Sequence, residues 1–262
     1  MIPEDRRKTI LNLLNEKGYM SVDELAKAIY VSIPTIRRDL NSLEKEGSIK
    51  RTHGGASPAN HNFSIWPFAL RNKVNLEAKK YIGSLAAKLV KNGDSIFIDS
   101  STTCLYMAKE LDKTLDLNVM TNSLPIAQTL AEYSNITVEC PGGRYYANSA
   151  SFFPFETSPS IAQRSARFCF ITCGGFDLKH GLTGASNIDI PTKRAFHQYA
   201  QKTVLLMDSS KFDAAYYYHV FPLDEVDILI TEHPMPEEYQ ALCEEMGIPV
   251  ICNEIQMKDL RI

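Results

Sequence analysis

The segment from Ser32 to Ala56 constrains the fold and function of this chain more than any other part of its sequence. At about 100° per residue, Ile36, Leu40 and Leu43 fall on one stripe of a helix, and polar residues project from the opposite side. The stripe can pack into a core while the polar side faces solvent or a groove. The segment therefore predicts an amphipathic helix with one free face.

Residues at both ends of this segment define where the helix begins and stops. Ser32 carries an oxygen suited to cap a first turn, and Pro34 is tolerated there because the first backbone N–H groups have no helical partner. Gly47 provides a stop about four turns later. The predicted helix therefore runs from near Ser32 to just before Gly47.

Two other helices and a hairpin surround this helix in the sequence. Arg6 to Asn15 has apolar residues at helical spacing, and Ser21 to Glu24 has the S-x-x-E form of a capping box. A tight turn at Tyr30–Val31 joins the second and third helices. Then Ser48 to Arg51 predicts a strand and Gly54–Gly55 a turn. This order is the outline of a winged helix-turn-helix.

The polar helix face and the hairpin supply the residues expected to contact DNA. Arg38 lies at the centre of the face and is the candidate for a base edge. Asp39 lies near the apolar edge and is expected to pair with a neighbouring basic side chain instead. Charged helix faces are often only solvated, and a wing histidine can simply close a turn. The candidate DNA-binding residues are Ser32, Thr35, Arg37, Arg38, Asn41, Arg51 and His53.

Charge and composition divide the chain. The first 57 residues carry 10 Lys and Arg against 8 Asp and Glu, and the remainder carries 18 against 23. This balance predicts a local basic patch. Proline and asparagine interrupt any periodicity after residue 57. We expect a DNA-binding domain at residues 1–57, a linker at 58–75, and an effector-binding and oligomerisation domain at 76–262.

Apolar runs and cysteines indicate the setting of the protein. No apolar run approaches the roughly 18 residues of a membrane helix, and the charged N-terminus lacks a signal peptide's apolar segment, so we expect a cytoplasmic protein. The six cysteines are scattered, several of them in apolar runs, which predicts buried, reduced thiols. Cys169 and Cys173 lack a second pair or nearby histidines. We expect no metal site and no cofactor.

From residue 76 the chain alternates helical patterns with short apolar runs. This alternation predicts an α/β fold with a mainly parallel sheet covered on both faces. The predicted strands are Ser95–Ile98, Leu117–Met120, Thr137–Cys140, Phe168–Thr172, Thr203–Met207, Asp227–Ile230 and Val250–Cys252. The predicted helices are Glu77–Val90, Cys104–Leu111, Leu124–Tyr133, Thr192–Tyr199 and Pro236–Met246.

Small or hydrogen-bonding residues follow five of these strands, where open α/β sheets bind ligands. The turn Ser100–Thr103 offers hydroxyls and helix N-terminal N–H groups to a phosphate, and Lys211 adds a charge. Asp99 or Asp177 could accept sugar hydroxyls. Such turns also serve simply as helix caps. The candidates are Asp99, Ser100, Ser101, Thr102, Thr103, Thr121, Asn122, Ser123, Gly142, Gly143, Asp177 and Lys211.

The third helix and the wing carry a specific signature. It consists of Ser32 to Leu40, Leu43, Gly47, Arg51 and His53 to Ala56. This signature resembles that of the DeoR family of bacterial sugar-metabolism repressors, and the resemblance continues through most of the chain. It implies a transcriptional repressor of a carbohydrate operon, whose partners are double-stranded operator DNA and a phosphorylated sugar or similar metabolite.

The second domain carries further elements of that family, including Gly181 to Thr183, Lys193 to Ala195 and Asp208 to Phe212. By this resemblance the domain is similar to the ribose-5-phosphate isomerase and CoA-transferase group of folds. Its ligand would then be a sugar phosphate or a related metabolite. The resemblance also adds Lys193 to the expected effector-binding residues.

Two classes of function compete. The first is a ligand-responsive transcription factor, and the second is a sugar-phosphate isomerase or transferase with an appended DNA-binding domain. Proton shuttling needs a base of shifted pKa beside the substrate, and no motif assigns Asp99 or Asp177 that role. We therefore expect a regulator and not an enzyme. Because single winged domains bind DNA weakly, we also expect a homodimer or homotetramer.

Overall fold

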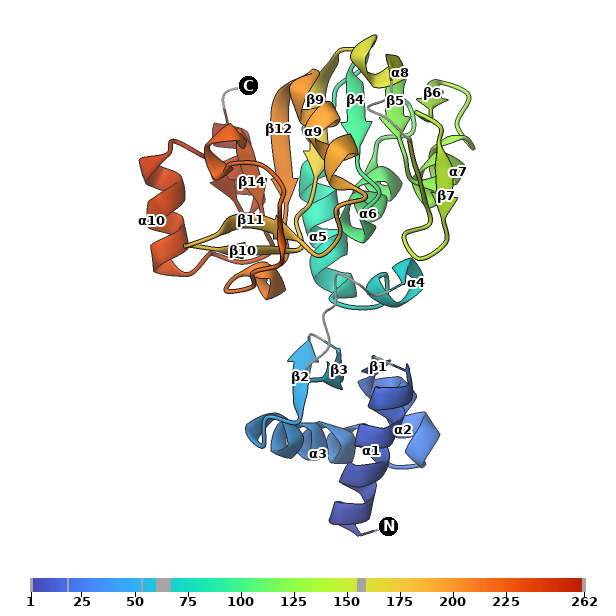
Figure 1. The fold of residues 1–262 in the computed structure, drawn as a ribbon, viewed down its shortest axis with the longest axis vertical. Helices are drawn as coiled ribbons and strands as arrows, with labels where there is room; N and C mark the ends of the chain where they lie inside the picture. The colour runs from blue at the N-terminus through green and yellow to red at the C-terminus, as the bar shows by residue number, and fades with distance from the viewer. Residues whose placement is uncertain (1, 18, 53, 60–66, 155–158, 261–262) are drawn as a thin grey trace. The chain divides into compact units, whose positions relative to one another are not determined.

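The computed structural model of the chain describes residues 2–17, 19–52, 54–59, 67–154 and 159–260. Met1–Leu76 and Glu77–Ile262 form two compact units (Figure 1). Each unit contains its own apolar cluster. No helix within the described ranges is long and apolar enough to cross a membrane.

In the described part of residues 3–58, the first unit contains three helices and a small antiparallel sheet of order β1-β3-β2 (Figure 1). The elements are α1 (Pro3–Lys17), β1 (Met20–Ser21), α2 (Val22–Ile29), α3 (Ile33–Lys45), β2 (Ile49–Thr52) and β3 (Gly55–Pro58). Its core includes Ile10, Leu14, Leu25, Ile36, Leu40, Leu43, Ile49 and Ala56. The predicted winged helix-turn-helix is confirmed.

Local residues set the ends of α2 and α3. The side chains and backbone of Ser21 and Glu24 form the predicted capping box, with hydrogen bonds of 3.1 and 2.9 Å. Tyr30 ends α2 with a φ of 58°, which turns the chain sharply towards α3. Ser32 is the N-cap of α3, but the predicted side-chain cap is wrong. Its hydroxyl instead lies 2.9 Å from the hydroxyl of Thr35.

Residues 67–76, which we call the strap, complete the first unit. They include the short helix α4 (Phe68–Arg71). Leu70 and Val74 pack with Tyr19, and Lys73 Nζ lies 3.0 Å from Glu24 Oε1. The strap is therefore attached to the unit that contains α3.

A seven-stranded parallel sheet of order β15-β14-β12-β9-β4-β5-β6 forms the second unit (Figure 1). The strands are β4 (Ser95–Ile98), β5 (Leu117–Thr121), β6 (Ile136–Glu139), β9 (Ala166–Ile171), β12 (Ala200–Leu206), β14 (Ile228–Ile230) and β15 (Val250–Ile251). The helices are α5 (Leu76–Ala87), α6 (Thr102–Glu110), α7 (Leu124–Leu130), α8 (Pro159–Ala162), α9 (Ile190–Gln198), α10 (Glu237–Glu245) and α11 (Glu254–Asp259). Every predicted strand and helix of this domain is present, so the α/β fold is confirmed.

The central strands are apolar on both faces. Residues 168–171 of β9 are all fully buried, and successive residues of a strand point to opposite faces, so both faces of the sheet are covered. Cys169 lies in this run and Cys173 just beyond it, and burial raises the pKa of their thiols to about 12 and about 11. All six cysteines are free. Four are buried, as predicted, whereas Cys140 is exposed and Cys252 is half-buried.

Two small antiparallel sheets are not predicted from the sequence. One pairs β7 (Arg144–Tyr146) with β8 (Ser151–Phe153), and the other joins β10 (Gly175–Asp177), β11 (Gly181–Gly184) and β13 (Tyr218–His219). Each of these strands has two to four residues, which is too short for an alternating pattern to appear.

Candidate functional site

The helix α3 presents a polar free side. Its apolar stripe lies in the core, whereas Arg37, Arg38 and Asn41 are exposed. At its first turn, Ser32 is exposed and Thr35 is half-buried. The helix thus offers two guanidinium groups, an amide and two hydroxyls, which are the groups that contact bases and phosphates in DNA complexes.

One side-chain contact ties the wing to α3. Arg51 of β2 donates a hydrogen bond from Nη1 to Asn41 Oδ1 of α3. Two candidate residues from different elements are therefore brought together. His53, the remaining wing candidate, lies outside the described residues.

A buried ion pair fixes α3 against α1. Asp39 is 4% exposed and accepts hydrogen bonds from two nitrogens of Arg6, one of them 3.1 Å from Asp39 Oδ1. These hydrogen bonds raise the pKa of Arg6 above its ordinary value. The prediction that Asp39 pairs with a basic neighbour is confirmed, and the pair leaves Arg37 and Arg38 free to face outward.

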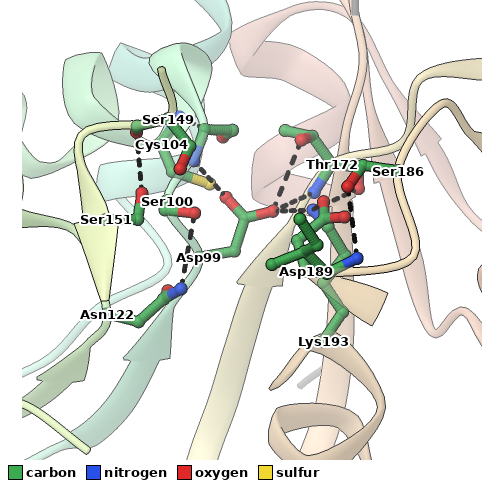
Figure 2. A network of polar contacts seen from close by, with 12 residues as sticks. Asp99, Ser100, Cys104, Asn122, Ser149, Ser151, Thr172, Ser186, Asp189 and Lys193 are labelled. Atoms are coloured by element: carbon green, nitrogen blue, oxygen red, sulfur yellow. Dashed lines mark hydrogen bonds and ion pairs between the residues drawn. The ribbon is translucent and has the colours of Figure 1, made fainter. Parts of the chain in front are cut away.

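The sheet of the second unit changes its direction of growth between β4 and β9. From β4 the chain adds β5 and β6 on one side, and it adds β9, β12, β14 and β15 on the other. Open α/β sheets bind ligands outside the carboxyl ends of strands at such a switch point. Asp99 follows β4 and Thr172 follows β9, so both residues lie at this boundary (Figure 2).

A second buried ion pair occupies the switch point (Figure 2). The Asp99 carboxylate accepts hydrogen bonds from the N–H of Ser101 at 2.8 Å and the N–H of Thr172 at 2.9 Å. It also accepts from the ammonium group of Lys193 in α9. Lys193 donates to the Thr172 carbonyl at 2.9 Å and lies 3.7 Å from the Asp189 carboxylate. The ends of two strands and α9 are therefore held together.

The ion pair keeps both of its groups charged. Burial alone would raise the pKa of Asp99, but Lys193 and hydrogen bonds from Ser101 hold it below its ordinary value. Burial would lower the pKa of Lys193, but Asp99 and Asp189 raise it above its ordinary value. Both candidate effector residues thus use their charges within the protein.

The hydroxyl-rich turn after β4 leads into α6 as expected. Ser101 is the N-cap, and its Oγ accepts a hydrogen bond from the N–H of Cys104 at 3.1 Å. Thr102 and Thr103 are buried in the first turn, and Ser100 is half-buried. The interpretation as a helix cap is confirmed for Ser101.

The turn after β5 lies next to the turn after β4. In the sheet Ile98 pairs with Thr121, so Asp99 and Asn122 follow at neighbouring strand ends. Asn122 Nδ2 lies 3.5 Å from Ser100 Oγ (Figure 2). The structure therefore brings these two groups of candidates together.

Three other candidates shape the backbone beside this site. Ser123 is the N-cap of α7, and its Oγ accepts from the N–H of Ile126 at 3.4 Å. Gly142 and Gly143 have φ angles of 78° and 108°, which favour glycine. A Cβ on Gly143 would lie 2.2 Å from the carbonyl oxygen of Phe153 in β8. Gly143 therefore allows the chain to pass closely beside β8, whereas Gly142 supplies only its positive φ.

Asp177 and Lys211 follow other strands. Asp177 Oδ1 accepts hydrogen bonds from the N–H groups of Lys179 and His180 in its own hairpin turn, at 3.0 and 2.9 Å. Lys211 is half-buried at the end of the 3-10 helix Ser209–Lys211. Although burial raises the pKa of Cys173, Lys211 and Lys193 both act to lower it. Cys173 therefore lies within the electrostatic reach of both lysines.

Sequence reasoning missed two partners of Lys193. The sequence predicts Thr172 only as the end of a strand. Its place at the carboxyl end of a parallel strand, where such sheets bind ligands, could have indicated a role in the site. Asp189 precedes Lys193 by four residues, a spacing that brings side chains together on a helix.

Together the two units define a class of protein, namely a winged helix-turn-helix joined to a parallel α/β domain with a polar cluster at its switch point. Family models agree with this class. A DeoR-like helix-turn-helix domain matches residues 6–61, and a DeoR C terminal sensor domain matches residues 74–233. The chain belongs to the DeoR family and is a DNA-binding transcriptional regulator, which confirms the resemblance.

Relatives match over nearly the full length. The chain is 35% identical over 92% of its length to the uncharacterized HTH-type transcriptional regulator YulB of Bacillus subtilis, covering 94% of that protein. It is 33% identical over 95% of its length to the HTH-type transcriptional regulator GolR of Listeria innocua, covering 98% of it. It is 30% identical over 97% to the HTH-type transcriptional repressor GlcR of Bacillus subtilis, covering 98% of it.

A more distant likeness is to a solved structure. Ribose 5-phosphate isomerase A of Methanocaldococcus jannaschii aligns with 53% of this chain at 17% identity and a TM-score of 0.39, covering 55% of the isomerase. A likeness at this level indicates neither a substrate nor a reaction.

Proposed function

We propose that this chain represses a carbohydrate-metabolism operon and that a phosphorylated sugar or related metabolite, bound by residues 76–262, changes its affinity for operator DNA. The convergence of polar groups at the switch point of a DeoR sensor domain carries this proposal. The name of GlcR supports repression. The DNA-binding part is residues 1–57, and residues 58–75 connect it to the sensor, with residues 67–75 packed against the first unit.

The proposed DNA contacts follow from exposure. Arg38 reads a base edge in the major groove, while Ser32, Thr35 and Arg37 contact phosphates. Asn41 and Arg51 act as one polar unit because they are hydrogen-bonded, and His53 completes the wing. A homodimer or homotetramer would read two half-sites about one helical turn apart, near 34 Å.

The proposed phosphate contacts are the turn Ser100–Thr103 and Lys211. Lys193 is already neutralised by Asp99, so Lys211 supplies the positive charge. Helix N-terminal N–H groups and hydroxyls complete the anion site. A full switch in DNA affinity needs about 5.5 kcal/mol of differential ligand affinity.

An enzymatic role is disfavoured by the state of the carboxylates. A general base works best with a pKa near the operating pH. Burial acts to raise the pKa values of both Asp99 and Asp177. Lys193 nevertheless holds the pKa of Asp99 below its ordinary value, and hydrogen bonds in the turn with His180 do the same for Asp177. Incubation with aldose and ketose phosphates tests this alternative, and interconversion abolished by Asp177→Asn would establish it.

Fluorescence anisotropy with promoter fragments tests the DNA half of the proposal. We expect preference for one fragment over random duplex, with a log-log salt slope near −0.9 for each phosphate neutralised. A panel of sugar phosphates, screened by thermal shift, then identifies the effector, because a ligand that binds only the folded state raises its stability. No preference for any fragment at low salt would refute DNA-specific regulation.

Two variants test the effector half. Thr102→Val and Lys211→Ala should retain operator affinity and lose the response to the effector. Lys179→Ala, which changes an exposed lysine of the β10–β11 turn, is the matched control and should respond normally. Normal responses from both test variants would move the effector site elsewhere.

A further inference from the structure

The side chain of Asn122 is buried with one end unpaired. It is 1% exposed, and its Nδ2 lies 3.5 Å from Ser100 Oγ, the outer limit of a hydrogen bond (Figure 2). Within the described part of the chain, its Oδ1 is buried and has no hydrogen-bond partner. An unpaired buried oxygen destabilises the folded state, so its retention calls for an explanation.

The backbone on both sides of Asn122 is held in place. Its carbonyl accepts a hydrogen bond from the N–H of Phe152 at 2.8 Å, and the N–H of Leu124 donates to the carbonyl of Ala150 at 3.0 Å. Strand β8 therefore fixes the backbone of this turn. The amide projects from this fixed backbone and lies beside Ser100 at the switch point.

The other acceptors at this edge are occupied. Asp99 accepts from two backbone N–H groups and from Lys193, and Asp177 accepts from its own turn. Asn122 Oδ1, in contrast to these carboxylates, is buried and still able to accept a hydrogen bond. If the amide were rotated so that Ser100 donated to Oδ1, both Nδ2 hydrogens would be unpaired instead. A hydroxyl group can donate and accept, so it satisfies either orientation.

We propose that Asn122 is a specificity-determining residue, which hydrogen-bonds a hydroxyl of the effector beside the phosphate-binding turn Ser100–Thr103. This inference rests on the proposed function. A neutral amide matches an uncharged hydroxyl, whereas a ligand ammonium group would favour a carboxylate. On this inference the effector carries, besides its phosphate, at least one hydroxyl that Asn122 binds.

The first test needs no ligand. Asn122→Leu removes an unpaired polar group, so its melting temperature should equal or exceed that of the wild type. Asn135→Leu is the matched control, because the Asn135 amide donates to the carbonyls of Lys113 and Leu115. Asn135→Leu should melt several degrees lower. The pair Asn122→Ala and Asn135→Ala repeats the comparison with a smaller side chain. If Asn122 variants lose as much stability as their Asn135 counterparts, the amide is structural and the inference is overturned.

The second test uses ribose 5-phosphate, glucose 6-phosphate, their deoxy counterparts and inorganic phosphate as probes. The wild type should bind one sugar phosphate at least about tenfold more tightly than a deoxy counterpart, and Asn122→Leu should reduce that ratio to about one. Binding of inorganic phosphate should not change. If no sugar phosphate binds the wild type, the proposed function fails and the inference with it. If one binds and the variant keeps the discrimination, only the inference is overturned.

Discussion

The two candidate sites of this chain hold their polar side chains in opposite ways. On α3, Arg37 and Arg38 project from the surface, whereas at the switch point Asp99 and Lys193 are buried and paired. A double helix is larger than the domain that reads it and must be met by projecting side chains. A small metabolite is surrounded by the protein, so the residues around it must be fixed from within.

Each site nevertheless contains one ion pair of low exposure whose two groups bind each other. Arg6 and Asp39 join α1 to α3, and Lys193 and Asp99 join α9 to the ends of β4 and β9. The comparison predicts that losing the deeper pair has the larger effect, and that surface residues affect binding without affecting stability.

The largest expected effect comes from removing one partner of the deeper pair. Lys193→Met leaves the Asp99 carboxylate buried without its cation, and the free energy of unfolding should fall by about 3 to 5 kcal/mol. Urea unfolding at neutral pH measures the loss. The double variant Asp99→Leu/Lys193→Met removes both charges and should recover most of it. A single variant as stable as the wild type would contradict burial of the pair.

Acid should weaken the same pair. The pKa of Asp99 is lower in the folded protein than in the unfolded chain, so the ionised carboxylate contributes fully to the free energy of unfolding above about pH 4. This contribution is lost as the pH falls through the pKa of Asp99 in the folded protein. The pKa of Lys193 is raised, so the lysine stays charged in this range. The urea midpoint of the wild type should therefore fall more steeply below pH 4 than that of Asp99→Asn. Parallel pH profiles would show that Asp99 is not the responsible group.

The pair in the first unit should contribute less. Arg6→Ala removes two hydrogen bonds to Asp39 and should destabilise the first unit by about 2 kcal/mol. Thermal unfolding followed by circular dichroism measures the change. The control is Arg7→Ala, whose partner Glu46 is exposed, and it should cost less than about 1 kcal/mol. Equal losses would mean that burial does not distinguish the two pairs.

An exposed residue of α3 should affect binding alone. Arg38→Ala should weaken operator binding by about 1 to 3 kcal/mol and relax sequence preference, with no change in the urea midpoint. Lys45→Ala, at the end of the same helix, tests a phosphate-type contact and should act equally on all duplexes. A loss from Arg38→Ala that is identical for every sequence would assign Arg38 to the DNA backbone.

The first site could be predicted in more detail than the second. The free face of α3 follows from the spacing of Ile36, Leu40 and Leu43, because residues opposite an apolar stripe must be exposed. The pairing of Asp39 follows in the same way from its place at the stripe's edge. The sequence also predicts which turns meet at the switch point, because polar residues follow consecutive parallel strands.

The hydrogen-bond partners of the polar groups in the second site could not be predicted from the sequence. Nothing local indicates that Lys193 turns to Asp99, 94 residues earlier in the chain, or that Asn122 keeps an unpaired oxygen. These facts depend on the packing of α9 against β9 and β12 and on the short hairpin β7–β8, whose strands show no pattern. Internal hydrogen bonding is a tertiary property, so sequence periodicity does not reveal it.

The smallest expected effect concerns the exposed pair in the strap, Lys73 and Glu24. Their side chains are 57% and 41% exposed, so Lys73→Ala should cost the first unit only about 0.2 to 1 kcal/mol, and the loss should fade in high salt. Glu24→Ala should cost more, because Glu24 also accepts from the backbone of Ser21 in the capping box. The double variant isolates the coupling of the pair. The coupling energy between Lys73 and Glu24 could prove as large as that between Lys193 and Asp99 and independent of salt. That result would mean that the strap is buried in solution and that the burial seen here does not rank the strengths of the ion pairs in this chain.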